Sequence, residues 1–224
     1  MATKTEARRS IPGWLELVLL LAAALALSVL IKTFFVQMFF VPSESMEPLF
    51  VDNDRILVQK ISYWTGSVQR GDVVVFEDPG GWLGATPALN PVQKVLSTVG
   101  LYPTGGHLVK RVIAVGGDEV ACCDDQGRVT VNGVPLDERS YIKKGTAPSE
   151  REFDVHVPPG RLWVMGDNRA NSEDSRFHMD LPGHGTIPED DVVGKVWAIV
   201  WPADRFEVVP RPQTFEQRAL QKTG

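Results

Sequence analysis

Apolar residues are concentrated near the start of the chain, in one long run. Between Trp14 and Val41 only Glu16 and Lys32 are charged. The first part of this run, residues 14–31, would form a helix of about 27 Å at ~1.5 Å per residue, close to the ~30 Å hydrocarbon core of a lipid bilayer. We therefore expect a transmembrane anchor over residues 14–41, preceded by a short N-terminus at residues 1–13.

A cleaved secretory signal peptide is the alternative for this region. Small residues at 22–26 resemble a cleavage site of such a peptide. The apolar residues continue past this site to Val41, which favours a retained, single-pass anchor in the cell membrane. Basic residues precede the run at Lys4, Arg8 and Arg9. The positive-inside rule then predicts a cytoplasmic N-terminus and an extracytoplasmic remainder.

After Val41 the pattern changes to short apolar or alternating runs separated by turn residues, which is typical of β-strands. The clearest runs are residues 55–60, 72–76, 108–115, 129–131, 161–165 and 192–200. Asn132-Gly133 separates two short runs, which predicts a tight hairpin turn. We expect residues 42–210 to form a mostly β domain built from hairpins and coiled antiparallel sheets.

Two segments depart from this β pattern. Residues 79–106 form an insertion bounded by Gly and Pro, and residues 92–99 carry Val and Leu at the spacing of a short amphipathic helix. With Trp82 and Leu83 nearby, the insertion either lies on the membrane surface or packs on the domain, and both interpretations stay open. Residues 211–224 are polar and lack β periodicity, so we expect a loose C-terminal tail.

Composition narrows the class of function. The 224 residues suit one domain with an appendage. The formal net charge is -5; residues 1–41 contribute +2, so residues 42–224 carry -7. This acidic balance argues against binding of nucleic acid, since phosphates need basic partners. Cys122 and Cys123 are too few for a four-thiolate zinc site, and they are either free or joined as a vicinal disulfide.

Two polar features could carry chemistry. The segment Val41-Pro42-Ser43-Glu44-Ser45-Met46-Glu47-Pro48 follows the apolar run directly and holds two serines. In the run 108–115, Lys110 shares a face with apolar residues. A lysine in that place would be desolvated, which lowers its pKa by disfavouring the ammonium form. The alternative is an edge-strand lysine that opposes aggregation.

The third polar feature is the loop 166–176, which follows the run 161–165. Its oxygen-bearing side chains resemble a calcium loop in part. However, Arg169 occupies a ligand position and Ser172 replaces the required glycine. We therefore expect no metal here, and no cofactor.

Taken in order, these features resemble the bacterial type I signal peptidases, which are membrane-anchored serine–lysine endopeptidases. The matching segments are Pro42-Ser43-x-Ser45-Met46-x-Pro48 and residues 54–58, 71–76, 109–113, 116–118, 131–133, 166–176 and 193–195. Each fragment alone is weak, but the ordered set after one apolar run is specific. The resemblance covers residues 40–202 and implies a coiled, mostly β catalytic domain.

The resemblance also implies roles for individual residues. Ser45 would be the nucleophile and Lys110 its general base, a task for which an ordinary lysine with a pKa near ~10.4 is too basic until burial lowers that value. The Ser45 amide and the Ser43 hydroxyl would form the oxyanion hole. Supporting residues would be Ser172, which orients the lysine ammonium, and the ion pairs Arg111–Asp167 and Asp174–Arg176.

The implied substrates are secretory preproteins, cut after small residues at the first and third positions before the scissile bond. Shallow pockets for these residues would be lined by Val41, Pro42, Met46 and Val109. The chain departs from the family at Ala170, where an acid is common, and at Glu44, where a small residue is common. If the Glu44 carboxylate faced Lys110 it would raise the pKa of the lysine, whereas pointing to solvent it would do no harm.

Other functions stay open beside general signal-peptide processing. A specialised relative would process a few dedicated substrates, such as surface-fibre subunits. An anchored β-domain that only binds partners would have no need of both Ser45 and Lys110. A Ser–His–Asp triad is also open, although no matching segment places one of the four histidines beside Ser45.

Overall fold

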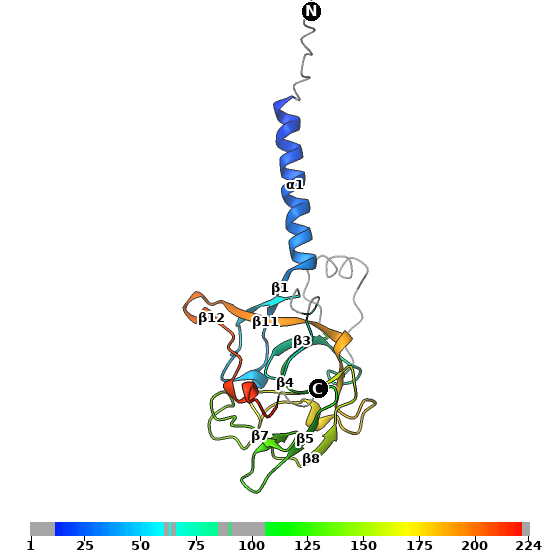
Figure 1. The fold of residues 1–224 in the computed structure, drawn as a ribbon. Coiled ribbons are helices and arrows are strands. Elements are labelled where there is room, and N and C mark those ends of the chain that lie inside the picture. Colours follow the sequence, from blue (N-terminus) through cyan, green and yellow to red (C-terminus); the bar gives the residue numbers. More distant parts are fainter. Residues whose placement is uncertain (1–11, 61–62, 64–65, 85–89, 91–105, 221–224) are drawn as a thin grey trace, which may run out of the picture.

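The computed structural model describes residues 12–60, 63, 66–84, 90 and 106–220, with the backbone alone for residues 30–34. Within this part of the chain one long helix, α1 (Gly13–Phe34), projects from a β-domain (Figure 1). Large apolar side chains are exposed along it, among them Trp14, Leu17, Leu21 and Leu25. In the same part of the chain, no helix is both long enough and apolar enough to qualify as a membrane-crossing segment.

The apolar run at residues 14–41 contains two elements, so the expected anchor is wrong in its C-terminal part. The helix ends at Phe34, and strand β1 (Val36–Phe40) follows. β1 pairs antiparallel with β2 (Arg55–Gln59), and Phe39 packs against the core while Phe40 is exposed. Hydrophobicity alone does not distinguish a helix from a strand. Residues 36–40 form a strand because they pair with β2.

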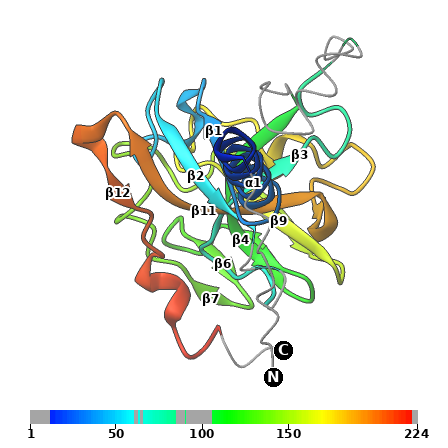
Figure 2. The ribbon, with the colours of Figure 1, turned by 90° about the horizontal axis from the view of Figure 1, so that it is seen from above.

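The larger sheet carries the candidate chemistry. In the described structure its antiparallel strand order is β1-β2-β11-β3-β4-β9-β10, with β12 paired to β11. The strands not yet located are β3 (Val73–Glu77), β4 (His107–Val115), β9 (Arg161–Met165), β10 (Ile187–Pro188), β11 (Val192–Trp201) and β12 (Glu207–Val208). Figure 2 looks along α1 and shows the helix standing over this sheet near β1 and β2.

A smaller sheet lies at the end of the domain away from α1 (Figure 1). Its order is β7-β6-β5-β8, formed by β5 (Glu119–Cys122), β6 (Val129–Val131), β7 (Val134–Pro135) and β8 (Phe153–His156). Asn132 and Gly133 connect β6 to β7 with φ of 52° and 73°, the backbone that a tight hairpin turn requires. The expected hairpin and the mostly β fold are therefore confirmed.

Short 3₁₀ turns connect the strands. They are η1 (Glu44–Met46), η2 (Ser175–Phe177), η3 (Glu189–Asp191), η4 (Ala203–Arg205) and η5 (Gln213–Glu216). Two of them, η1 and η2, flank the candidate site described below.

The C-terminal segment is packed, so the expected loose tail is wrong for residues 211–220. Phe215 and Leu220 are buried in the same core cluster as Tyr141. The Phe215 ring lies so close to Gly71, at φ +87°, that a Cβ there would contact it. Arg70 Nη1 donates to the carbonyl of Leu220 at 2.8 Å. Two apolar residues are enough to anchor an otherwise polar segment, while residues 221–224 lie outside the described part.

The start of the insertion at residues 79–106 also packs on the domain. Trp82 is only 6% exposed, stacks on His178 with ring centroids 4.4 Å apart, and meets Phe76 edge-on. Asp78 Oδ1 accepts a hydrogen bond from the Trp82 amide at 3.0 Å. Trp82 is therefore not a membrane contact. The helix expected over residues 92–99 lies outside the described residues.

Candidate active site

The serine loop, defined as residues 43–48, follows β1 and turns through η1. Val41, just before it, exchanges backbone hydrogen bonds with the segment 53–54, its amide reaching the Asp54 carbonyl at 2.9 Å. Met46 is buried beside Val41 and Phe50 in the core. Because apolar residues on either side are held in the core, Ser45 is presented between them at the surface, partly exposed.

Lys110 lies in β4 and points at Ser45. Its Nζ donates to Ser45 Oγ at 2.7 Å, although the two residues are 65 positions apart in the chain. Lys110 is 4% exposed, so the predicted burial is confirmed. Burial lowers the pKa of Lys110 to about 8, an effect that the nearby carboxylates of Asp174 and Asp167 partly oppose.

The hydroxyl of Ser45 has a second partner in Ser43, whose Oγ lies 3.2 Å away. Its hydrogen-bond partners in the described part of the chain are thus a lysine and a serine. The carboxylate of Glu44 points to the side of the loop, where it accepts a hydrogen bond from Asn171 Nδ2 at 3.3 Å and helps to raise the pKa of Lys143. Of the two orientations considered for Glu44, the exposed one is found.

The loop 166–176 holds the serine loop through hydrogen bonds to its backbone. The Asn168 amide donates to the Ser45 carbonyl at 3.1 Å, and Asn168 Nδ2 donates to the Glu44 carbonyl at 3.0 Å. A Cβ on Gly166 would collide with Ser172 Oγ and with the Ser45 carbonyl. Asn168 and Gly166 belong to a segment that the sequence singles out, but nothing in the pattern indicates these contacts.

Both expected ion pairs are present and fully buried. Arg111 binds both carboxylate oxygens of Asp167, at 2.8 and 2.6 Å, and Arg176 binds both of Asp174 at 2.8 Å. Burial alone would raise the pKa of Asp174, but the hydrogen bond and charge of Arg176 hold it below its usual value. Asp174 also accepts the Gly166 amide at 2.9 Å. The pairs therefore hold the loop that contacts Ser45.

Ser172 lies within this loop, 5% exposed. Its hydroxyl is buried and has no hydrogen-bond partner among the described residues. The expected contact between Ser172 and the Lys110 ammonium is therefore not among the contacts that the structure describes.

A third buried ion pair was not expected from the sequence. Arg169 Nη2 lies 2.6 Å from Glu138 Oε1, and Tyr141 donates to the same oxygen. Arg169 also donates to the Pro148 carbonyl at 2.7 Å, while Arg176 reaches the neighbouring Ser149. Arg169 lies in a singled-out segment, but Glu138 lies in an unremarkable stretch about thirty residues earlier and gives no signal of its own.

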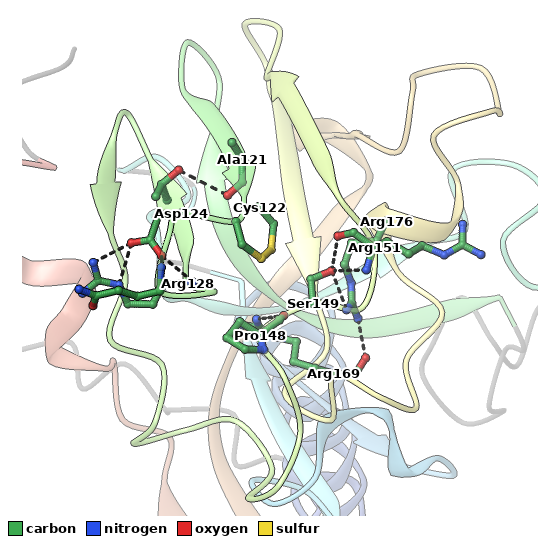
Figure 3. Close-up of a disulfide and its surroundings, with 12 residues drawn as sticks. Ala121, Cys122, Asp124, Arg128, Pro148, Ser149, Arg151, Arg169 and Arg176 are labelled. Carbon is green, nitrogen blue, oxygen red and sulfur yellow. Dashed lines mark hydrogen bonds and ion pairs between the residues drawn. A yellow bond between two sulfur atoms is a disulfide. The ribbon is translucent and has the colours of Figure 1, made fainter.

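Cys122 and Cys123 form a vicinal disulfide at the end of β5, and Figure 3 is a close-up of its surroundings. Ser149, Arg169 and Arg176 lie nearby (Figure 3). Within the part of the chain that the structure describes, no group of three His, Cys, Asp or Glu side chains is placed to hold a metal ion.

The residues expected to line substrate pockets are only partly accessible. Val41 and Met46 are buried core residues, Val109 is half-buried against them, and Pro42 is exposed. Val41, Met46 and Val109 belong to the same apolar core cluster.

Comparison with known proteins adds to this geometry. The model of the family described as signal peptidase, peptidase S26, matches residues 14–201. The signal peptidase I of Mycobacterium tuberculosis is 43% identical over 221 residues, covering 87% of this chain and 74% of that protein. The probable signal peptidase I of Mycobacterium leprae is 40% identical, covering 85% and 77%. The signal peptidase I U of Bacillus subtilis is 30% identical, covering 87% and 90%. A match of this extent, which includes both Ser45 and Lys110, means that the chain belongs to the signal peptidase family, peptidase S26.

Proposed function

We propose that this chain removes signal peptides from preproteins with Ser45 as the nucleophile and Lys110 as the general base. Membership of the family makes it a serine endopeptidase of the signal peptidase class. The assignment of the two residues is carried by one observation, the 2.7 Å hydrogen bond between a buried lysine amine and the serine hydroxyl.

The reaction needs only these two groups for proton transfer. Neutral Lys110 takes the hydroxyl proton while Ser45 Oγ attacks the scissile carbonyl carbon. The resulting ammonium gives this proton to the leaving amine as the C–N bond breaks, which leaves an acyl ester on Ser45. Lys110, neutral again, then takes a proton from a water molecule that attacks the ester, and returns it to Ser45 Oγ as the acyl C–O bond breaks and the carboxylic acid leaves. A pKa of about 8 keeps part of the lysine neutral under mildly alkaline conditions.

Oxyanion stabilisation is assigned to the Ser45 amide and the Ser43 hydroxyl. Support comes from the 3.2 Å distance between the two hydroxyl oxygens, which keeps Ser43 beside the attacking atom. A donor that meets negative charge only in the transition state contributes roughly 3 kcal/mol.

Ser172 and the buried ion pairs are assigned supporting roles. The Ser172 hydroxyl is buried, lacks a partner in the described structure and packs against Gly166, so it is available to orient the Lys110 ammonium once the amine is protonated. The pairs Arg111–Asp167 and Asp174–Arg176 position the loop that carries Ser172.

The substrate is proposed to bind along β4. Pairing between β4 and β9 begins at Arg111, so residues 107–110 are paired by β3 on one side and not by β9 on the other. An extended peptide can add to such an edge through backbone hydrogen bonds. Val41, Pro42, Met46 and Val109 would then lie beside the small side chains at the first and third positions before the bond.

We also propose that α1 anchors the chain in a lipid bilayer, with residues 1–13 in the cytoplasm and the catalytic domain outside. The support is its length of 22 residues, about 33 Å at ~1.5 Å per residue, and its exposed leucines. Exposed aromatic residues on the β11–β12 side of the domain, Trp201 and Phe206, suit a membrane–water boundary.

The proposal is tested by cleavage of a labelled preprotein with the full chain in detergent. The wild type should release the mature protein, whereas Ser45→Ala and Lys110→Ala should not. Ser140→Ala and Lys144→Ala, at exposed positions, serve as matched controls and should cleave normally. Full activity in Lys110→Ala would refute the dyad.

A further inference from the structure

Two acidic residues flank Ser45 in the chain, and among the described residues only Glu47 of the two forms an ion pair. Glu47 Oε2 accepts a hydrogen bond from Lys143 Nζ at 2.6 Å. Glu44 immediately precedes Ser45, and its exposed carboxylate contacts the neutral amide of Asn171 at 3.3 Å. Together Glu44, Glu47 and Lys143 carry a net charge of one negative unit, held beside Ser45.

Hydrogen bonds from Asn168 hold the backbone of Glu44 and Ser45 in place. Asn168 Nδ2 holds the Glu44 carbonyl at 3.0 Å, and the Asn168 amide holds the Ser45 carbonyl at 3.1 Å. Since Asn168 is itself buried, these contacts keep Glu44 and Ser45 fixed against the loop 166–176. The Glu44 carboxylate therefore stays near one flank of the site.

The register of β4 and β9 indicates on which side of the scissile bond the Glu44 carboxylate lies. The open edge of β4 runs over residues 107–110 and ends at Lys110, because β9 pairs from Arg111 onward. β9 then continues through Gly166 into the loop that contacts Glu44. A peptide that runs parallel to β4 along this edge, with its scissile bond beside Lys110, thus has its residues beyond that bond next to Glu44.

We infer that Glu44 is a specificity-determining residue that favours basic and disfavours acidic residues at the first positions after the scissile bond. This inference rests on the proposed function of Ser45 and Lys110. For exposed unit charges about 7 Å apart, Coulomb's law with a dielectric between surface and bulk values gives a rate effect of roughly three- to tenfold. Added salt screens such an effect, with a Debye length of about 10 Å at 0.1 M.

The test compares two peptides that differ only in having Lys or Glu at the first position after the bond. In low salt, the full-length enzyme should cleave the Lys peptide with a kcat/KM roughly nine- to hundredfold higher than the Glu peptide, because the two peptides differ by two units of charge. Glu44→Gln, which keeps the backbone contact to Asn168, should bring this ratio close to one. Lys143→Gln removes a positive charge and should raise the ratio. Glu119→Gln makes the same charge change as Glu44→Gln on the smaller sheet and should leave the ratio unchanged.

The outcomes separate this inference from the proposed function. Equal cleavage of both peptides by the wild type, or a ratio that persists in Glu44→Gln or at high salt, overturns the inference while the proposed function stands. Failure of the enzyme to cleave either peptide, or any precursor, overturns both.

Discussion

The dependence of cleavage on pH should follow the protonation of Lys110. In the proposed dyad the lysine has to be neutral to accept the proton of Ser45, and burial lowers its pKa from 10.5 to about 8. For a peptide without titratable groups near the cleavage site, kcat/KM reports this ionisation in the free enzyme. The effect of pH on kcat/KM can therefore be calculated from the pKa of Lys110.

The shape of the profile distinguishes the buried lysine from an ordinary one. With a pKa of about 8, the neutral fraction is about 9% at pH 7 and about 91% at pH 9, so kcat/KM should rise about tenfold and then level off. A lysine at its ordinary pKa would be about 0.03% neutral at pH 7 and about 3% neutral at pH 9. Its profile would rise about a hundredfold over the same range without reaching a plateau.

The assay is a fluorogenic peptide cleavage measured from pH 6 to 10 in detergent at constant ionic strength. Lys144→Gln is the control, because Lys144 is exposed and its substitution leaves the Glu47–Lys143 pair beside Ser45 intact, so the midpoint should stay unchanged. A rate that is flat from pH 6 to 9, or one that still climbs tenfold per pH unit at pH 10, would refute the reasoning about Lys110.

Four substitutions test other parts of the structure. Lys110→Met should raise the stability of the inactive enzyme near pH 7. The pKa of Lys110 is about 8 in the folded state and 10.5 in the unfolded state, so at pH 7 the buried ammonium destabilises the fold. The gain in unfolding free energy from Lys110→Met should therefore be largest below pH 8 and shrink between pH 8 and 10.5. Denaturant titration at several pH values checks this. Gly166→Ala should lower kcat at least about a hundredfold, because its Cβ displaces the Ser45 carbonyl, with the loss seen in single-turnover assays. Asn168→Ala should lower kcat roughly tenfold with little change in KM, since it frees the Glu44 carbonyl from its donor; a loss confined to KM would contradict the bracing role. Phe215→Ala should cost about 3–5 kcal/mol of unfolding free energy, and an unchanged melting temperature would show that the C-terminal segment is not packed as described.

Local patterns in the sequence indicated the strands and the buried lysine. Short apolar or alternating runs placed β2, β3, β4, β6, β9 and β11 within a residue or two, because a strand buried on both faces is apolar throughout and a half-buried strand alternates its side chains. The Asn132-Gly133 turn was also predicted from local sequence, because few residue types adopt a φ above zero. The lone lysine among apolar neighbours in β4 indicated a buried amine for the same kind of reason, because alternate residues of a strand share one face.

Tertiary structure alone decided the features that depend on partners distant in the chain. Residues 36–40 are a strand because β2 pairs with them, and Phe215 is anchored because Gly71 leaves space for its ring. The pairing of Arg169 with Glu138 and the outward direction of the Glu44 carboxylate are likewise set by contacts across 31 and 127 positions. The physical reason is the same in each case: hydrophobicity and backbone preference act between neighbours in sequence, whereas pairing, packing and charge depend on distances that exist only in the folded chain.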